Sequence, residues 1–136
     1  MSIEFKGMEE VLGMFDTAEN FEKLEKALEK ACLIVERSAK QKAPKGNGDL
    51  RRSITHKVEG LVGSVYTPLE YAPYVEYGTG LFAENGGRTD VPWSYKDDKG
   101  EWHSTCGREP MPYMRPALDE NREEIIRILW EGLTSD

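Results

Sequence analysis

His103 and Cys106 are the residues whose types and spacing come nearest to a metal-binding pair in this chain. They lie three positions apart, and the carboxylates of Asp97 and Asp98 stand close before them. A structural zinc site usually takes four ligands from two close pairs. The other histidine and the other cysteine lie far apart in the sequence and supply no second pair. The spacing therefore favours a polar hairpin edge with a free thiol over a zinc site.

Cys106 could pair with one of the two histidines for nucleophilic catalysis, but no pattern in the sequence supplies a third group that orients the histidine or donors for an oxyanion. The segment 45–48 (KGNG) has glycines but lacks the spacing of a phosphate-binding loop. Glu123 and Glu124 are neighbours in a helical segment, where adjacent side chains point apart, so they are expected on a solvated face. We therefore expect no catalytic residue, no cofactor and no metal.

The composition is that of a polar globular chain. It has 136 residues, of which 32% are charged and 38% hydrophobic, so we expect one domain over 1–136. No run approaches the roughly 18 apolar residues of a membrane span. The first ten residues lack the basic start and apolar stretch of a signal peptide. Two cysteines are too few for a disulfide framework, so a cytosolic origin is expected. Since neither a membrane span nor a signal peptide is indicated, no membrane partner is expected.

The charge is unevenly distributed. The net charge of −7 argues against a general nucleic-acid binder, whose affinity depends on neutralising phosphates. Residues 36–57 nevertheless hold seven Lys and Arg against two acids, a charge of +5, and residues 117–136 hold six acids against two arginines, a charge of −4. The basic stretch could pair with another copy, contact nucleic acid, or be a solvated helix end and loop. The candidate interface residues in the two stretches are Arg37, Lys40, Arg51, Arg52, Glu123 and Glu124.

A strand and a long helix are expected to open the chain. Alternation at Ile3 and Phe5 predicts a short strand, and residues 8–15 form a short apolar segment of one or two helical turns. The clearest element is an amphipathic helix over 17–43, capped by Asp16 with Glu19 and ended by Pro44. Its apolar face consists of Phe21, Leu24, Leu28, Ala31, Val35 and Ala39, and Cys32 is expected as a core thiol.

The rest of the chain favours two hairpins and a second helix. Residues 50–67 predict a hairpin with a turn at Glu59-Gly60, and 93–105 a second hairpin around 97–100. The connection 69–92 is Gly- and Pro-rich, and 80–92 is expected to be its flexible part. Residues 110–116 are expected to be extended, with Pro116 at the first helical position. The closing helix would bury Leu118, Ile125, Leu129 and Leu133, with Ile126 and Trp130 widening its apolar side.

Aromatic residues concentrate in the middle third of the chain. They are Tyr66, Tyr71, Tyr74, Tyr77, Phe82, Trp93, Tyr95 and Trp102. Some must belong to the core. So many aromatics among prolines and glycines also suit a protein–protein surface, because Tyr and Trp anchor interfaces. Both explanations remain open from the sequence.

Three stretches in order resemble one family. They are residues 43–54 (APKGNGDLRRSI), residues 71–80 (YAPYVEYGTG) and residues 110–118 (PMPYMRPAL). At this length and in this order they resemble the small tail-component proteins of long-tailed, lambdoid-type bacteriophages and prophages, also called tail-completion, neck or head–tail joining proteins. The resemblance spans roughly residues 3–130. Asn47 stands where the family usually has Thr, and Asn suits the turn.

The resemblance implies an α+β fold, with a long amphipathic helix packed on an antiparallel β-sheet and a C-terminal helix. It implies a structural protein of the virion neck or tail that is no enzyme and is assembled in the host cytoplasm. Its implied partners are further copies in a ring-like homo-oligomer, hexameric in the virion, other connector and tail-tube proteins, and passing DNA in transient contact.

The motifs of the resemblance add candidate interface residues. They are Tyr74, Glu76, Tyr77, Tyr113, Met114 and Arg115. Glu76 is placed to receive a basic or backbone donor, and Arg115 is the partner we expect. Prolines hold residues 110–112 extended, so that Tyr113 and Met114 can insert into the sheet or into a neighbour. Packing within the chain and use at an interface are equally good explanations of these residues.

Two other functions are consistent with the residues. One is a metal-dependent, nuclease-like enzyme that uses His103, Cys106 and the nearby acids. The other is a nucleic-acid-binding module that uses the basic stretch 37–57. Metal analysis and a nuclease assay separate the first, and salt-dependent DNA binding separates the second.

Overall fold

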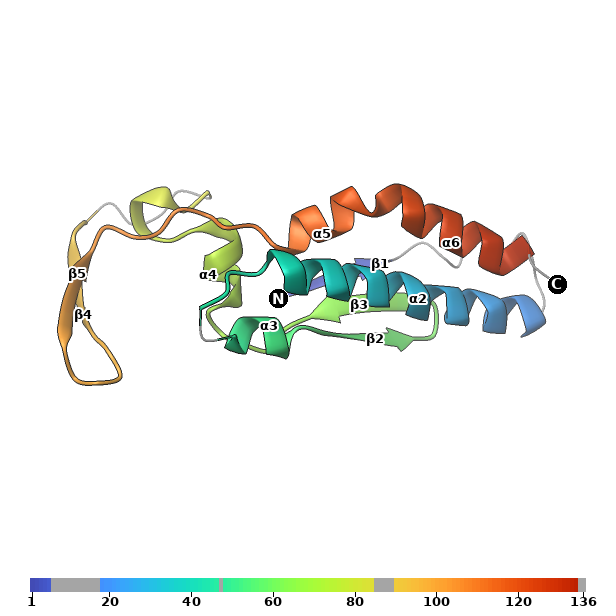
Figure 1. The fold of residues 1–136 in the computed structure, drawn as a ribbon, viewed down its shortest axis with the longest axis horizontal. Helices are drawn as coiled ribbons and strands as arrows, with labels where there is room; N and C mark the ends of the chain where they lie inside the picture. The colour runs from blue at the N-terminus through green and yellow to red at the C-terminus, as the bar shows by residue number, and fades with distance from the viewer. Residues whose placement is uncertain (6–17, 47, 85–89, 135–136) are drawn as a thin grey trace. The chain divides into compact units, whose positions relative to one another are not determined.

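A computed structural model of the chain describes residues 1–5, 18–46, 48–84 and 90–134. Its contacts form two units, shown in Figure 1: residues 1–69 with 113–136, called the core unit here, and residues 70–112, called the middle unit. Helices and antiparallel strands confirm the expected α+β fold. The short helical segment expected at 8–15 and the cap at Asp16 lie outside the described residues, as do residues 85–89 of the segment expected to be flexible.

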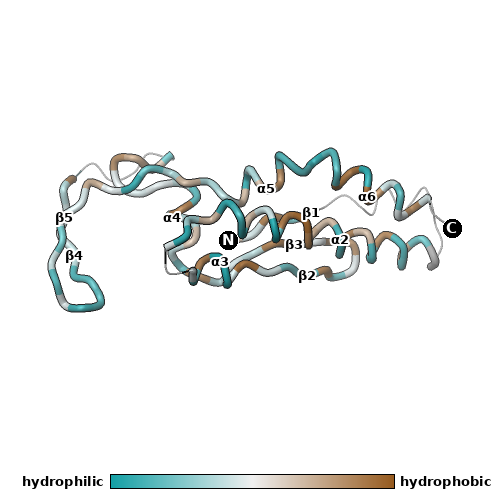
Figure 2. The backbone as a smooth tube through the Cα atoms, in the orientation of Figure 1, coloured by the Kyte–Doolittle hydropathy of each residue, from teal (hydrophilic) through white to brown (hydrophobic). Residues whose placement is uncertain are grey.

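A long helix on a three-stranded sheet forms the centre of the core unit. The helix is α2 (Ala18–Lys42), and the strands are β1 (Ser2–Phe5), β2 (Thr55–Glu59) and β3 (Val62–Tyr66), in the order β1-β3-β2 with antiparallel pairing. In Figure 2 apolar positions recur along α2 and in β1 and β3. The predicted helix and its buried face are confirmed. All the residues predicted for that face are buried except Phe21, which is half-buried. Cys32 is fully buried beside this face.

The first hairpin differs from the prediction at its start and at its turn. Residues 49–53 are a short helix, α3 (Asp49–Ser53), rather than the start of a strand. Gly48 has φ 83°, a conformation that favours glycine, and the N–H of Arg52 donates to its carbonyl at 3.0 Å. The turn lies at Gly60-Leu61, one residue later than expected, because Glu59 pairs with Val62. The hairpin itself is confirmed over 55–66.

The closing helix is two helices, α5 (Met114–Glu120) and α6 (Arg122–Thr134), which run alongside α2 (Figure 1). Helix α5 begins at Met114, before Pro116, so Pro116 lies in its first turn. The N–H groups of a first turn have no acceptor within the helix, so the missing N–H of proline costs no helical hydrogen bond. The break falls at Asn121, whose Nδ2 donates to the carbonyl of Ala117 at 2.7 Å. Ile125 and Leu133 are buried, and Leu118 and Leu129 are half-buried.

One expectation for the closing helix is wrong. Ile126 and Trp130 do not widen the buried side of α6, since they are 61% and 59% exposed. They lie one helical turn apart, so they share a face that points away from α2. Gly132 instead faces α2, because a Cβ built on it would lie 2.7 Å from Cβ of Ala27. The glycine therefore permits the close approach of α6 to α2.

The middle unit holds helices where the sequence suggests a long connection. They are α4 (Ala72–Tyr77) and the 3-10 helix η1 (Gly80–Phe82). Pro73 fits the first turn of α4, and Gly78, with φ 82°, ends it. The segment after the hairpin runs back beside these helices: the N–H groups of Thr79 and Leu81 donate to residues 108 and 106, and Met111 N–H donates to Val75.

The second hairpin is confirmed as the antiparallel strands β4 (Trp93–Lys96) and β5 (Trp102–Thr105) of a separate two-stranded sheet. Its turn is closed by Asp97, whose Oδ1 accepts the backbone N–H groups of Lys99 and Glu101 at 2.9 and 2.8 Å. In the part of the chain that is described, no helix is long and apolar enough to cross a membrane.

Candidate functional site

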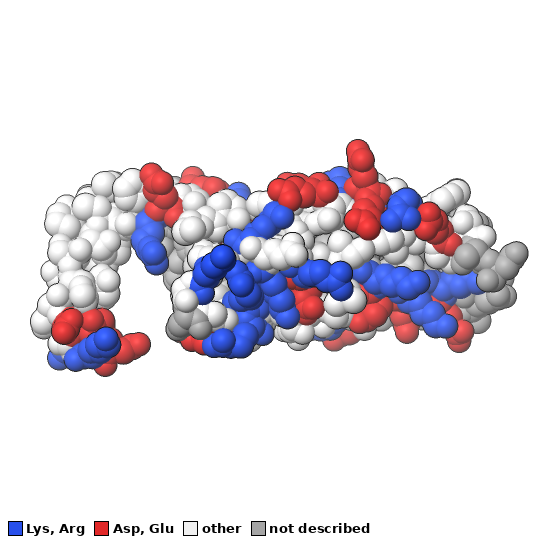
Figure 3. Space-filling view, in the orientation of Figure 1, with Lys and Arg blue, Asp and Glu red and all other residues white. Residues whose placement is uncertain are grey.

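Lys and Arg side chains gather over the second half of α2 and over α3, as the blue atoms of Figure 3 show. We call this the basic surface and define it by Arg37, Lys40, Lys45, Arg51 and Arg52. The two arginines of α3 are engaged locally: Arg52 pairs with Asp49 at 2.6 Å, and Arg51 donates to a backbone carbonyl. Among the described residues, Arg37, Lys40 and Lys45 have no ion pair. The free charge of the surface therefore lies with these three cations.

Part of the acidic C-terminal stretch meets the basic stretch within the same chain. Lys42 Nζ lies 2.6 Å from Oε2 of Glu120 and donates to Ser38 Oγ at 3.2 Å. Glu124 pairs with Arg127 at 3.6 Å, and Glu123 is exposed in the first turn of α6. A polar groove of about 380 Å³ runs here between α2 and the start of α6, lined by Ile34, Arg37, Ser38, Gln41, Lys42, Glu120, Asn121 and Glu124.

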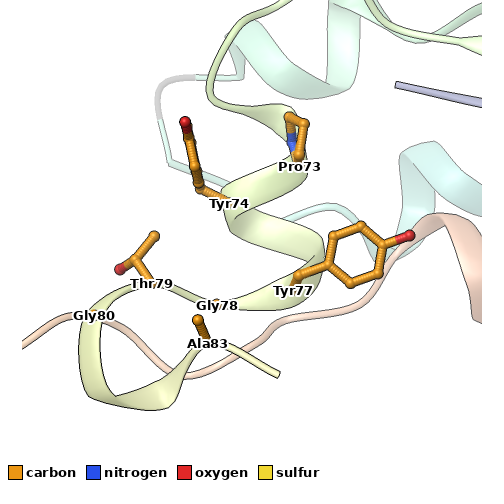
Figure 4. Close-up of a pocket in the computed structure, with 7 residues that line it drawn as sticks. All are labelled: Pro73, Tyr74, Tyr77, Gly78, Thr79, Gly80 and Ala83. Carbon is orange, nitrogen blue, oxygen red and sulfur yellow. The ribbon is translucent and has the colours of Figure 1, made fainter. Parts of the chain in front are cut away.

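The middle unit presents an aromatic surface on α4 and η1. Tyr74 is 61% exposed and Leu81 is 53% exposed, and Tyr71, Tyr77 and Phe82 are exposed as well. A hollow of about 300 Å³ lies among Pro73, Tyr74, Tyr77, Gly78, Thr79, Gly80 and Ala83 (Figure 4). Figure 4 shows the two tyrosine rings projecting from α4 in different directions. The interface candidates Tyr74 and Tyr77 are therefore accessible.

Apolar side chains are distributed very differently in the two units. Among the described residues, eight of the eleven exposed large apolar side chains lie in residues 70–112, and Ala72 is the one buried apolar residue described there. The core unit holds the other seventeen of the eighteen buried apolar residues that the structure describes. The described part of the middle unit thus has almost no hydrophobic core of its own.

Three other interface candidates are buried. Tyr113 and Met114 are fully buried, and the Tyr113 hydroxyl donates to Sδ of Met1 at 3.6 Å, so packing within the chain accounts for them. Glu76 is also fully buried. It belongs to the middle unit and the half-buried Arg115 to the core unit, and their pairing stays a prediction.

The second hairpin carries the chain's acidic and histidine cluster. His103 Nε2 lies 2.6 Å from Oδ2 of Asp97, and its ring stacks on Tyr95 with centroids 5.4 Å apart. The bond from His103, with the backbone N–H groups of the turn, holds the pKa of Asp97 below its usual value. The ligand atoms of Asp97, Glu101 and His103 lie within 4.8 Å of one another. Among the described residues, Glu101, which stands just before β5 and two residues before His103, completes this group, and the exposed Cys106 is not part of it.

A charged cluster that was not predicted from the sequence lies between α2 and β2. His56 lies between two acids of α2: its Nδ1 is 3.3 Å from Oε1 of Glu36, and its Nε2 contacts Oε1 of Glu29. Burial lowers the pKa of His56, but its hydrogen bonds to both carboxylates outweigh this and raise the pKa above 6.5. Two acids seven residues apart share a helix face, and that spacing is the signal that could have found the cluster.

Cys32 lies in the same region of α2. Burial, together with the charges of Glu29 and Glu36, raises the pKa of its thiol to about 12. Cys32 is therefore a thiol at neutral pH, as expected for a cysteine of the core. Cys106, in contrast, is exposed.

Residues 12–78 match the family described as "Bacteriophage HK97-gp10, putative tail-component". The match contains the first of the three stretches, residues 43–54, and most of the second, whereas the third at 110–118 lies beyond it. The resemblance to a phage tail-component family is thereby confirmed. No curated protein and no solved structure matched the chain.

Proposed function

We propose that this chain, a phage tail component by its match over residues 12–78, completes the tail or joins head to tail as a structural protein of the neck. It acts by binding copies of itself and neighbouring connector and tail-tube proteins, and it catalyses no reaction. It assembles in the host cytoplasm and stays in the virion.

The observation that carries the proposal is the middle unit: of the residues that the structure describes, eight of the eleven exposed large apolar side chains lie there, and Ala72 alone is a buried apolar residue. Exposed apolar patches rich in aromatic residues mark protein interaction sites. A neck protein must make such contacts with its neighbours on every side, which an isolated enzyme domain need not do.

A ring of identical copies, hexameric in the virion, is the assembly that we propose. A closed ring requires two different surfaces of one chain that fit each other. The basic surface on α2 and α3 and the exposed Glu123 and Glu124 on α6 carry opposite charges on different elements, which supports such a contact. Charge complementarity would set the register of the contact more than its affinity.

DNA is the rival partner of the basic surface, and Arg37, Lys40 and Lys45 are the cations that would touch its phosphates. The net charge of −7 disfavours DNA binding. So do the ion pairs that Arg52 forms with Asp49 and that Lys42 forms with Glu120, because they neutralise two nearby cations. Binding to phosphates would give an affinity that falls steeply with salt concentration, and each lost contact would reduce the slope by about one. Titration of duplex DNA at several salt concentrations separates this function from protein–protein assembly.

Quantitative mass spectrometry of purified virions tests the proposal. Labelled full-length chain serves as the internal standard, and the portal and major tail proteins of the same particles provide the reference copy numbers. We expect the chain in tailed particles at the copy number of one ring. Absence from particles that carry complete tails would overturn the structural role.

A further inference from the structure

Two acids, a histidine and a tyrosine share one face of the β4–β5 hairpin. Tyr95 pairs with His103 in the register of the two strands. Two residues farther along, the N–H of Asp97 donates to the carbonyl of Glu101 at 2.9 Å, so the same register continues into the turn. Because successive side chains of a strand point to opposite faces, these four residues lie on the same face.

Three of these side chains have the geometry to ligate one metal ion. The ligand atoms of Asp97, Glu101 and His103 lie within 4.8 Å of one another, and Oδ2 of Asp97 is 2.6 Å from Nε2 of His103. A tetrahedral zinc ion about 2.1 Å from each ligand atom sets those atoms about 3.4 Å apart. Small side-chain rotations reach that geometry, and water can fill the remaining position, since Glu101 and His103 are exposed.

The hairpin already orients two of the three ligands. Oδ1 of Asp97 accepts the N–H groups of Lys99 and Glu101, so Oδ2 is the oxygen directed at His103. The ring of His103 is held by stacking on Tyr95, with 5.4 Å between the centroids. A metal ion would take the place of the proton between Oδ2 and Nε2, and that proton would pass to the solvent.

The weak packing of the middle unit is an independent reason for a metal at this place. In the described part of residues 70–112, Ala72 is the one buried apolar residue, and the hairpin is a sheet of only two strands. Such a sheet is marginal in water unless it packs on something else. Domains below roughly 40 residues usually depend on disulfides, metals or oligomerisation, and the middle unit is close to that size. Both cysteines of the chain are free, so no disulfide stabilises the hairpin.

The donor set, rather than the charge of the tip, selects the class of ion. An imidazole nitrogen with two carboxylates suits Zn²⁺ and similar transition-metal ions, whereas Mg²⁺ and Ca²⁺ prefer oxygen ligands. The charge of the tip is mixed, because Lys96 and Lys99 stand among its acids. Lys96 pairs with Trp102 and therefore lies on the other face of the hairpin. General attraction of cations to the tip is thus small, and binding depends on the ligand atoms.

We propose that Asp97, Glu101 and His103 bind a divalent transition-metal ion, with Zn²⁺ as the probe, and that this ion stabilises the β4–β5 hairpin. The ligands are Oδ2 of Asp97, a carboxylate oxygen of Glu101 and Nε2 of His103, with water completing the coordination. The role of the ion is structural, because it ties the end of β4 to the start of β5. The site is independent of the proposed role in the neck, no step of which uses a metal.

Titration of the full chain with zinc chloride tests the site. All variants carry Cys106→Ser, which removes the exposed thiol as a competing ligand. We expect NMR shifts in the amides of residues 95–103 and in the ring of His103, and calorimetry gives the affinity. His103→Gln and Glu101→Gln should each weaken binding at least about tenfold, a change of about 1.4 kcal/mol. The Glu101 side chain makes no hydrogen bond or ion pair with any residue that the structure describes, so Glu101→Gln leaves the hairpin contacts intact.

Asp98→Asn is the matched control. It removes the same charge from the same tip, but Asp98 is not among the three ligands, so Zn²⁺ should bind as it does to the parent chain. An excess of Mg²⁺ should not displace Zn²⁺. Zn²⁺ should also slow amide hydrogen exchange in β4 and β5 at least about tenfold in the parent chain and much less in Glu101→Gln. Circular dichroism verifies that each variant is folded.

Four outcomes would overturn the metal site. The first is no binding of Zn²⁺ at the hairpin, and the second is an equal loss of affinity in Asp98→Asn and Glu101→Gln. The third is displacement of Zn²⁺ by Mg²⁺, which would indicate general attraction to acids. The fourth is hydrogen exchange in β4 and β5 that Zn²⁺ leaves unchanged. Each of these results would leave the proposed tail role standing.

Discussion

Lys42 at the end of α2 and Glu120 at the end of α5 form an ion pair, with 2.6 Å between Nζ and Oε2. The pair links the long helix to the closing helices and brings the basic and acidic stretches of the sequence together in one chain. By their charge alone, the two stretches could instead meet between neighbouring copies. The pair removes one cation and one acid from that role, whereas Arg37, Lys40 and Lys45 have no ion pair with any residue that the structure describes.

The apolar face of α2 holds the core unit together, and Leu28 lies in its middle with no exposed surface. Leu28→Ala should lower the free energy of unfolding by about 2–5 kcal/mol, because it leaves a cavity in a closely packed core. Glu22→Ala, on the exposed side of the same helix, should change it by at most about 0.5 kcal/mol. Urea unfolding of both variants measures this, and equal losses would contradict the assigned face.

Gly132 allows α6 to approach α2, and its replacement tests that packing. Gly132→Ala should destabilise the chain, although alanine favours a helix by about 1 kcal/mol, because its Cβ would lie 2.7 Å from Cβ of Ala27. Ala27→Gly removes that atom and should restore part of the loss when both changes are combined. Thermal unfolding of the two single variants and the double variant gives the coupling, and a stabilising Gly132→Ala would show that the helices are farther apart.

His56 should stabilise the chain in a pH-dependent way. Its pKa in the folded chain is raised above 6.5, whereas in the unfolded chain it has its ordinary value, so its contribution is fully present below about pH 6.5. The contribution is lost as the pH rises through the raised pKa of the folded chain. His56→Gln should therefore destabilise the chain more at about pH 5 than at about pH 8. Urea unfolding across that range measures the difference.

The carboxylates of α2 provide the control for His56. Glu29→Gln combined with Glu36→Gln removes both acceptors of its ring. In that background the substitution of His56 should lose its dependence on pH. A difference between wild type and His56→Gln that grows as the pH rises would contradict the assigned contacts.

The two cysteines should differ sharply in reactivity. Cys32 is fully buried and the pKa of its thiol is raised to about 12, whereas Cys106 is exposed. Because the thiolate is the reactive form, a thiol reagent at neutral pH should label Cys106 rapidly and Cys32 only after unfolding. Titration of the native and the urea-unfolded chain counts the reactive thiols, and Cys106→Ser should leave the native chain unlabelled. Rapid labelling of native Cys106→Ser would show that α2 opens at Cys32.

The sequence predicted elements whose signal is long or repeated. The stripe from Leu24 to Ala39 runs over four turns of α2, so no local feature could outweigh it. The hairpins at 55–66 and 93–105 were also found, since each has a turn signal between two alternating runs. Over residues 12–78, the family match supports the phage tail role that the ordered motifs indicated.

What the sequence could not predict depends on short elements and on distant contacts. Leu50 and Ile54 suit a strand by composition, yet the conformation of Gly48 and the Arg52–Asp49 pair favour the five residues of α3. Helix α4 was missed because its Gly and Pro neighbours indicate a loop. The place of His56 between two acids depends on the packing of β2 on α2, and periodicity along one element carries no information about it.

A phage that lacks this chain provides the most direct test of the proposed role in the neck. The phage carries a nonsense codon early in the gene and is grown in cells with and without a plasmid that supplies the wild-type chain. Electron microscopy then compares the particles in the two lysates. We predict filled heads and tails that remain unjoined or incomplete without the chain, and complete virions when it is supplied. Normal numbers of complete, infectious virions in its absence would contradict the role.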